Sequence, residues 1–407
     1  MHVRKCSVLV IGAGPAGSAA AYALARGGHD VVLVDQHAFP RDKVCGDALI
    51  PDALAALRRL DVLERVLAHA QRAETVRIVA PNGSFVDLQG GTACLPRNVL
   101  DTLLLDHARA AGAEFLAPLR LAALHEEGGA VAGADLVHAR TQERMRIAAP
   151  ITLLATGAAA QPLQLAGLCT RKEASGFAVR LYVHGPQFVD RLRGLWLSFD
   201  REVRPGYGWI FGGPDGVFNV GAGVFRAGRK EEDGANVRAL FTRFVQSFAP
   251  AAALLASGEV RGPLKGAPLR TALQGAHFGR AGVLAIGEAA ATTYSFSGEG
   301  IGKAIESALL AAELCGLHLR GELDAALLPA RYATELRARY GPRFAAYEKA
   351  ERWLARPVFC NFLAARARAS DLVRARLEGM LTETIDPDAI FSASGVLAAL
   401  LPSFGRR

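Results

Sequence analysis

Three glycines near the N-terminus have the spacing that a phosphate-binding turn requires. They lie between the apolar run 8–11 and a helix-like stretch, 18–26. The first permits a tight turn, the second lets the backbone approach a diphosphate, and the third lets the helix pack closely on the strand. The sequence therefore predicts a dinucleotide site, and a glycine turn without a ligand is the alternative. Its predicted residues are Gly12, Gly14, Pro15, Ala16 and Gly17.

An acidic residue completes this pattern. Asp35 directly follows a second apolar run, 31–34. Its carboxylate could accept hydrogen bonds from the hydroxyls of a ribose, while the N-terminus of the helix offers free N–H groups and a positive dipole to the phosphates. Strand, glycine turn, helix, strand and acid follow in the order of a dinucleotide-binding βαβ unit.

A second strand ends in a glycine and an acid, Gly287 and Glu288, after the apolar run 282–286. Glu288 could bind a ribityl hydroxyl, and a solvated side chain at a turn is the alternative. Gly298, Gly300 and Ile301 lie where a glycine-rich loop leads into a long helix. A helix N-terminus there would stabilise the negative charge of a reduced flavin. Gly157, at the end of the apolar strand 151–155, is also predicted to contact the cofactor.

Further candidates are two arginines and a row of aromatic residues. Arg41 and Arg97 could neutralise phosphates or hold the adenosine half, and exposed arginines are the alternative. Tyr207 and Trp209 alternate on a predicted strand, so with Phe211 they share one face. That row is either ordinary core packing or the wall of a cavity for an apolar, elongated or planar substrate.

These features together resemble the FAD-binding fold of p-hydroxybenzoate-hydroxylase-type flavoproteins. Three motifs narrow the resemblance to the geranylgeranyl reductase family, over residues 5–320. The stretch 43–47 (KVCGD) resembles that family's KxCGD loop, residues 205–223 resemble its PxxYxWxFP…NVGxG signature, and residues 296–301 (FSGEGI) resemble its P-F-S/T-G-E-G-I loop. The resemblance implies that Cys45 and Gly46 lie beside the isoalloxazine ring, where a thiol could donate a proton. A small buried hydrophobe is the alternative for Cys45.

The activity implied by the resemblance is reduction of carbon–carbon double bonds in an isoprenoid or other apolar substrate by reduced FAD. The predicted catalytic residues are Cys45, Gly46, Tyr207 and Trp209. Glu288 replaces the family's usual Asp, Gly212 a Pro, and Tyr294-Ser295 an Asn-Pro pair; the last two changes are expected to alter the wall near the flavin. They leave open a flavin monooxygenase or halogenase acting on an aromatic substrate, including one carried on a partner protein. A flavin-bearing structural or redox-sensing subunit is a third hypothesis.

The predicted fold class is α/β plus β, with a Rossmann-like FAD-binding domain, an antiparallel-sheet substrate domain and a helical C-terminal segment. We expect the discontinuous FAD-binding domain to comprise 1–75, 95–172 and 275–325, and the substrate-binding domain 76–94 and 173–274. Residues 326–407 form the helical region. Between 174 and 260 we expect four strands and one helix, 236–248.

Charge and composition restrict the partners. The 407 residues carry a net charge of +8, and residues 331–376 hold 11 Lys and Arg against 4 Asp and Glu. Basic C-terminal helices could contact an anionic membrane surface or an acidic protein, and a solvated face over packed helices is the alternative. The apolar stretch 389–401 could cap the substrate cavity. Neither a nucleic-acid motif nor a metal-binding spacing among the six cysteines is apparent.

Two features that the sequence lacks restrict the electron donor and the compartment: a second dinucleotide-binding motif and a long apolar stretch. A second GxGxxG is absent, so reduced nicotinamide, ferredoxin or free reduced flavin would have to reach the FAD from outside. No apolar stretch reaches the ~18 residues that a transmembrane helix needs. We therefore expect a cytoplasmic protein that is at most peripheral to a membrane.

Overall fold

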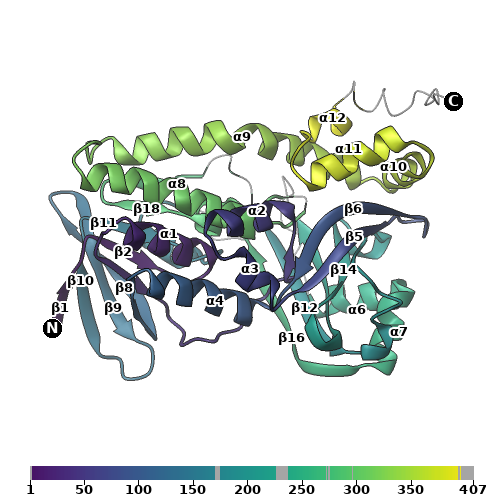
Figure 1. Cartoon of the computed structure of the whole chain (residues 1–407), viewed down its shortest axis with the longest axis horizontal. Coiled ribbons are helices and arrows are strands. Elements are labelled where there is room, and N and C mark those ends of the chain that lie inside the picture. The colour runs from purple at the N-terminus through teal and green to yellow at the C-terminus, as the bar shows by residue number, and fades with distance from the viewer. Residues whose placement is uncertain are drawn as a thin grey trace.

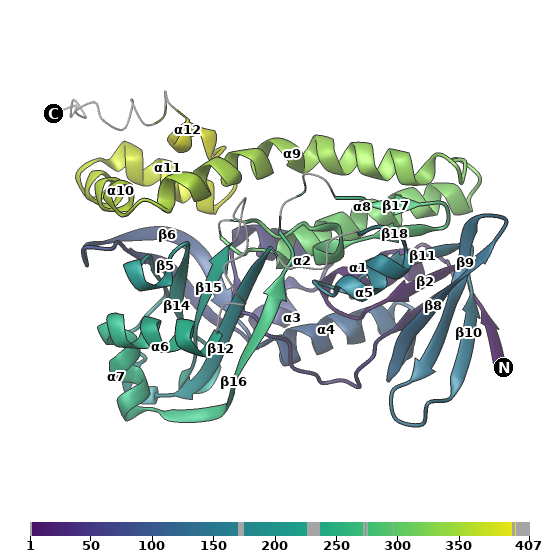
Figure 2. The ribbon, with the colours of Figure 1, turned by 180° about the vertical axis from the view of Figure 1, so that it is seen from behind.

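The computed structural model describes residues 2–169, 175–225, 237–271, 273, 276–295, 297–392 and 395. In this part of the chain, three sheets lie beneath and beside a layer of C-terminal helices (Figure 1). Seen from behind, the sheet built from β12 to β16 lies at the opposite end of the molecule from the N-terminus (Figure 2). The predicted combination of an α/β domain, a largely antiparallel sheet and C-terminal helices is confirmed.

A six-stranded, mostly parallel sheet carries the N-terminal glycine turn. Its strand order is β17-β18-β11-β2-β3-β7, and every residue of β2, β3, β11 and β18 is buried. Short apolar strands suit a sheet that is covered on both faces. The carboxyl ends of these strands meet at one edge, so Gly12, Asp35, Thr156 and Gly287 come together there. The strands are β2 (Val8–Ile11), β3 (Val31–Val34), β7 (Glu114–Leu116), β11 (Ile151–Leu154), β17 (Gly279–Arg280) and β18 (Val283–Ala285).

An eight-stranded sheet forms the other half of the molecule, in the order β16-β12-β15-β14-β13-β5-β6-β4. A hairpin around the turn 81–83, the β5–β6 pair, belongs to this sheet and joins β13 in parallel. The first strand of this hairpin begins at residue 71, before the boundary predicted at 76. The strands are β4 (Ala48–Leu49), β5 (Gln71–Val79), β6 (Phe85–Cys94), β12 (Gly176–His184), β13 (Leu195–Ser198), β14 (Gly206–Gly212), β15 (Val217–Phe225) and β16 (Glu259–Leu269).

The predicted helix at 236–248 is confirmed as the first of two helices in this region, and the second helix was not predicted. Two helices, α6 (Val237–Ser247) and α7 (Ala249–Ser257), follow each other with a bend of 103°. The edge strand β16 was not predicted because it contains Pro263 and Pro268, which usually argue against a strand. An edge strand tolerates proline, since one side of its backbone needs no ladder partner.

A smaller four-stranded sheet packs beside the six-stranded one. In it, β1 pairs with β10 in parallel, so residues 2–5 join this sheet. The strands are β1 (His2–Lys5), β8 (Leu119–Glu127), β9 (Ala130–His138) and β10 (Arg144–Ala148).

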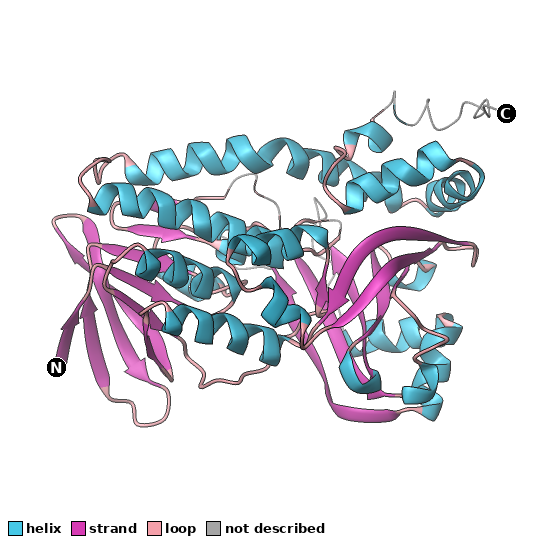
Figure 3. Ribbon diagram, in the orientation of Figure 1, coloured by secondary structure: helices cyan, strands magenta, loops and turns pink. Residues whose placement is uncertain are grey.

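Helices cover both large sheets (Figure 3). Helices α1 and α8 pack together on the six-stranded sheet, and α9 runs along α8 towards α10 and α11, which lie over β5 and β6 (Figure 1). We call α10, α11 and α12 the roof. The helices are α1 (Pro15–Arg26), α2 (Pro51–Arg59), α3 (Leu63–Leu67), α4 (Arg97–Ala110), α5 (Ala160–Leu165), α8 (Ile301–Leu319), α9 (Leu328–Leu354), α10 (Pro357–Ala369), α11 (Asp371–Leu381) and α12 (Asp388–Phe391).

Among the described residues, no single helix combines the length and apolarity needed to cross a bilayer; only the bent pair α6 and α7 reaches the threshold, by length and composition alone. The division of the chain into three domains stays a prediction.

Candidate cofactor and substrate site

One cavity of about 610 Å³ lies between the six-stranded sheet, the eight-stranded sheet and the roof. Of the predicted site residues, only Gly17 and Gly287 do not line it. Segments at 11–16, 41–48, 155–162, 207–211 and 297–304 all reach this one space. The predicted residues therefore lie together, and their contacts with a ligand stay predictions.

Gly17 and Gly287 position the elements around the cavity. A Cβ on Gly17 would lie 1.7 Å from the carbonyl oxygen of Gly12, and one on Gly287 would lie 2.7 Å from the Cβ of Ala16. Gly287 also has a φ of +63°, which favours glycine. These two glycines allow α1 to approach the strands closely, which is a packing role.

Two arginines converge on the N-terminus of α1. The helix is capped by Gly14 without a side-chain hydrogen bond. A Cβ on Gly14 would lie 3.5 Å from Nη2 of Arg41 and 3.9 Å from Nη2 of Arg97. Arg97 is buried and pairs with Asp101 at 2.7 and 2.8 Å, and Arg41 lies 3.1 Å from the same carboxylate. Two guanidinium groups and a free helix end make this a region suited to a diphosphate.

Asp35 is held rigidly at the end of β3. One carboxylate oxygen accepts from the backbone N–H of Ala13 and the other from that of His37, both at 2.9 Å. The side chain also lies 3.4 Å from Nε of Arg41. Because a carboxylate can accept more than two hydrogen bonds, Asp35 can still receive a hydroxyl at the cavity wall.

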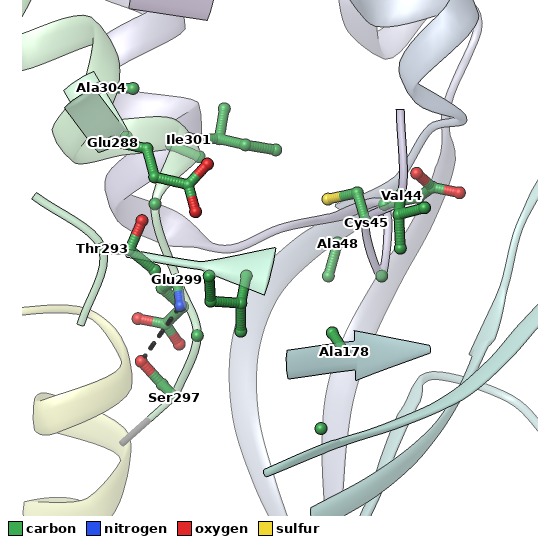
Figure 4. A pocket seen from close by; sticks show the side chains of 18 of the residues that line it. Val44, Cys45, Ala48, Ala178, Glu288, Thr293, Ser297, Glu299, Ile301 and Ala304 are labelled. Atoms are coloured by element: carbon green, nitrogen blue, oxygen red, sulfur yellow. Dashed lines mark hydrogen bonds between the residues drawn. The ribbon is translucent and has the colours of Figure 1, made fainter. Parts of the chain in front are cut away.

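Glu288 and Cys45 point into the cavity from opposite walls (Figure 4). Glu288 accepts a hydrogen bond from the backbone N–H of Arg270 at 3.2 Å, and its other oxygen lies 4.0 Å from Nζ of Lys43. Next to it, α8 begins at Ile301 with Gly300 as N-cap and no side-chain cap. The first N–H groups of a second helix thus face the same cavity.

The predicted aromatic row exists on β14. The rings of Tyr207, Trp209 and Phe211 follow one another at 6.1 Å, and all three line the cavity. The Tyr207 hydroxyl donates to the carbonyl of Ser297, and Nε1 of Trp209 donates to Oδ1 of Asn219 at 2.8 Å. Since both polar ends are engaged with protein groups, these residues contribute their ring faces to the wall.

Asn219 links two of the family-like motifs, the loop 43–47 and the segment 205–223, and the sequence analysis did not place it in the site. Besides accepting from Trp209, it donates through Nδ2 to the carbonyl of Cys45 and to Oδ2 of Asp47, each at 2.8 Å. The Tyr182 hydroxyl donates to the same Asp47 oxygen at 2.6 Å. The signal that could have found this network is the presence of Asn219 and Asp47 in the two motifs themselves.

Burial changes the titration of two groups in this loop. It raises the pKa of the Cys45 thiol, against the opposing effect of Arg97, so the thiol is protonated near neutral pH. Burial also raises the pKa of Asp47 to about 6, although the hydrogen bonds from Tyr182 and Asn219 favour its carboxylate. The loop therefore presents a neutral thiol beside an acid that titrates in the physiological range.

Tyr294 does not alter the cavity wall as expected. It is fully buried, packs against Phe344 and Tyr347 of α9, and donates to Glu383 at 2.9 Å. Glu383 also receives a hydrogen bond from the buried Lys303 at 2.7 Å. None of the three positions that were expected to alter the wall, Gly212, Tyr294 and Ser295, is among the lining residues, so this prediction is wrong.

The roof closes the cavity over the aromatic row with apolar side chains. Two exposed hydrogen bonds join it to the hairpin: Glu378 accepts from the N–H of Gln89 at 2.8 Å, and Asn361 accepts from that of Asn82 at 3.1 Å. The predicted cap at 389–401 lies mostly outside the described residues, apart from 389–392 and 395. The roof residues that line the cavity are Cys360, Leu363, Ala364, Leu377, Met380, Leu381 and Phe391.

Polar groups are unevenly distributed around the cavity. The charged lining residues lie at the end of β3, in the loop 41–47, on α2, α4 and β8, just after β18, and beside the N-terminus of α8. In contrast, the residues that line it from β5, β6, β13 and the roof are uncharged. This arrangement fits a dinucleotide with its phosphates at the two arginines, and an apolar molecule beneath the roof.

Comparison with known proteins agrees with this arrangement. Residues 5–178 match the model of a family described as an FAD binding domain. A menaquinone reductase from Mycolicibacterium smegmatis is 33% identical over 329 residues, 76% of each chain. A digeranylgeranylglycerophospholipid reductase from Methanoculleus marisnigri is 30% identical over 324 residues, 75% of each chain.

Solved structures show the same fold. A geranylgeranyl bacteriochlorophyll reductase-like protein from Thermoplasma acidophilum has a TM-score of 0.75 at 20% identity, covering 98% of this chain and 96% of its own. A flavin-dependent brominase also has a TM-score of 0.75, at 17% identity, with 97% of both chains covered. Similarity at these identities concerns the fold and does not separate reductase from halogenase chemistry.

Proposed function

The chain belongs to the geranylgeranyl reductase family of FAD-dependent oxidoreductases, and from this we propose that it reduces carbon–carbon double bonds in the isoprenoid part of an apolar substrate. The observation that carries the proposal is the part of the cavity between the aromatic row and the roof, which we call the chamber. The residues that line it from β5, β6, β13 and the roof are uncharged. A prenyl chain has few polar groups, so it binds by burial of its apolar surface. The names of the two relatives support a lipid or quinone substrate of this kind.

The residues of this chain would bind and orient the FAD and shield the reacting centre from water. When bound, FAD supplies the two-electron chemistry. Arg41, Arg97 and the N-terminus of α1 would hold its diphosphate. Asp35 and Glu288 would accept hydrogen bonds from its hydroxyls. The N-terminus of α8 would favour negative charge on the ring. The aromatic row and the roof exclude water from the reacting centre, which strengthens electrostatic interactions there.

The electron donor in this proposal reaches the FAD from outside. The charged side of the cavity is devoted to one dinucleotide, and the chain has one GxGxxG. Reduced nicotinamide, ferredoxin or free reduced flavin could serve. A test of the substrate therefore should supply electrons chemically, so that the result does not depend on the natural donor.

Anaerobic turnover tests the proposed function. The purified holoenzyme, reduced with dithionite, is expected to convert a digeranylgeranyl lipid, or a prenylated naphthoquinone analysed after its quinol has been reoxidised in air, into products heavier by two hydrogen atoms for each double bond reduced, as measured by mass spectrometry. The absence of such products, together with oxygen-dependent hydroxylation or halogenation of an aromatic substrate, would favour the monooxygenase or halogenase alternative.

A charge placed in the roof sharpens this test. Leu363→Arg would put an unpaired cation into the apolar chamber, since Leu363 is 6% exposed and lines the cavity. We expect kcat/KM to fall at least ~100-fold without loss of FAD, because a buried unpaired charge costs several kcal/mol. Leu327→Arg, at a position 58% exposed, is the matched control and should have little effect.

An anionic membrane surface is the partner that we infer for the roof. Val358 and Leu372, in the first turns of α10 and α11, are 81% and 57% exposed. The same helices carry Arg366, Arg368, Arg374 and Arg376. Exposed apolar side chains near arginines suit the headgroup region of a bilayer, from which a prenylated substrate could enter.

Vesicle flotation tests this partner. The wild type should float with vesicles containing an anionic phospholipid and stay behind with neutral ones. The double variant V358S/L372S should bind several-fold more weakly, because each apolar side chain contributes ~1 kcal/mol or more on insertion. Equal binding to both vesicle types would exclude the electrostatic part of the proposal, and unchanged binding by the variant would exclude the apolar part.

A further inference from the structure

Asp47 is a buried acid with one uncommitted oxygen. It is 1% exposed, and its Oδ2 accepts hydrogen bonds from Tyr182 and Asn219 at 2.6 and 2.8 Å. Among the described residues, its Oδ1 has no hydrogen-bond partner. In a neutral carboxylic acid, one oxygen carries the proton. Because Oδ2 already serves as the acceptor, the proton belongs on Oδ1.

The loop that carries Asp47 lies directly against the aromatic row. A Cβ on Gly46 would be 3.0 Å from the ring of Phe211 and 3.6 Å from that of Trp209. Asp47 itself has a φ of +68°, a left-handed conformation that is uncommon outside glycine and that suggests a position held by its surroundings. Cys45, two residues before it, points into the cavity (Figure 4). Asp47 is also a lining residue.

We propose that Asp47 is the proton donor that completes reduction of the substrate double bond; this role rests on the proposed function. Saturating one double bond adds two electrons and two protons. The two electrons and one proton would come from the reduced flavin. The second proton would come from Asp47, whose O–H bond breaks as a C–H bond forms on the substrate carbon. Asp47 is left as a carboxylate and regains its proton from solvent before the next cycle.

The surroundings of Asp47 stabilise that carboxylate. Two hydrogen-bond donors already face Oδ2, and the positive charges of Arg97 and Arg180 favour the ionised form. The charged and titratable groups that face it come from β12, β15, β6, α4 and its own loop. They are Tyr182, Arg180, Asn219 (a neutral donor), Cys94, Arg97 and Cys45.

The direction of the pH dependence follows. Burial raises the pKa of Asp47 to about 6, so the donor form predominates below that pH and is lost above it. With electrons supplied in excess, kcat should fall as the pH rises through the pKa of Asp47 in the complex. If Asp47 acted as a general base instead, kcat would rise as the pH rises through this pKa.

Three variants test the role. Asp47→Asn keeps the shape of the side chain but cannot donate an acidic proton, so kcat should fall about 10²- to 10⁴-fold with FAD retained. The fall of kcat with rising pH, which is the descending limb of the pH profile, should also disappear. Tyr182→Phe removes a hydrogen bond to the carboxylate, so the limb should move to higher pH. Asp52→Asn removes a rival buried carboxyl whose pKa burial raises to about 7, and it should keep the limb. Loss of the limb in D52N with its retention in D47N would overturn the proposal.

A measurement without turnover separates this proposal from the proposed function. In infrared difference spectra of the cofactor-free protein, a protonated carboxyl band should titrate near pH 6, vanish in D47N and titrate at higher pH in Y182F. If the wild type reduces prenyl substrates but D47N keeps both rate and pH profile, the donor role is wrong and the function stands. If the wild type shows no such turnover, the function fails and the donor role with it, whatever the infrared band shows. If D47N does not fold, an unshifted limb in Y182F overturns the proposal.

Discussion

Replacing Gly14 by valine is expected to abolish FAD retention while leaving the fold intact. Gly14 has a φ of −78°, which any residue can adopt, and a Cβ there would make only ordinary contacts with two arginine side chains. The protein alone therefore does not require glycine at this position. The larger side chain would occupy the space between α1 and the two guanidinium groups, where the diphosphate is proposed to lie.

The expected loss of affinity for FAD is at least about 1,000-fold, or about 4 kcal/mol. It can be measured from the flavin absorbance of the purified protein and from titration of the cofactor-free protein with FAD. Gly341→Val is the matched control, because Gly341 has no neighbour within 4 Å and lies in α9. A G14V protein that purifies with stoichiometric FAD would contradict the assignment of the phosphate site.

The same experiment distinguishes the two kinds of glycine in the turn. At Gly17 an added Cβ would lie 1.7 Å from a backbone oxygen, so Gly17→Val should prevent folding rather than weaken FAD binding alone. Circular dichroism should show native secondary structure in G14V and its loss in G17V.

Replacing Asn219 by alanine is expected to lower both the stability of the protein and its turnover. The change removes the partners of the Trp209 N–H, the Cys45 carbonyl and one hydrogen bond to Asp47, all of which lie beneath or beside the loop 43–47. Each buried polar group left without a partner costs about 1–3 kcal/mol. The free energy of unfolding should therefore fall by about 3–5 kcal/mol, and turnover should fall at least ~100-fold as the loop loses its anchor.

Urea unfolding followed by circular dichroism measures the stability change. Asn361→Ala is the control, because Asn361 also accepts a hydrogen bond from a distant backbone N–H but does so at the surface, where the expected change is below about 0.5 kcal/mol. Equal unfolding midpoints for N219A and the wild type would show that the network does not hold the loop.

Several features of the fold could be predicted because each depends on a short, continuous stretch of the sequence. The strands 8–11 and 31–34 are runs of apolar residues bounded by glycine or an acid, and the hairpin has an Asn-Gly turn. The strands β12 to β15 alternate apolar and polar residues or contain aromatic residues, and both patterns can be recognised within a short stretch of sequence. Where breakers interrupt the pattern, as in β16 and between α6 and α7, prediction failed because tertiary pairing overrides local preference.

The departures from the family-like motifs show the limit of position-by-position reasoning. Tyr294 stands in a motif next to the glycine loop, and proximity in sequence suggested a place in the wall. In the fold its ring packs under α9 and its hydroxyl reaches Glu383, 89 residues later. Sequence neighbours on an irregular loop can face opposite directions, and only packing decides which of them faces the cavity.

The amino-acid sequence alone determined the cofactor end of this protein. A diphosphate is recognised by backbone N–H groups of one strand–turn–helix unit, and the glycines, the helix and the acid of that unit lie within residues 8–35. The tertiary structure decided the substrate end. There, residues 174 positions apart share a hydrogen bond at Asn219, and the chamber is closed by helices from the far end of the chain. Such a surface depends on the side-chain packing of distant segments, which local sequence patterns do not specify.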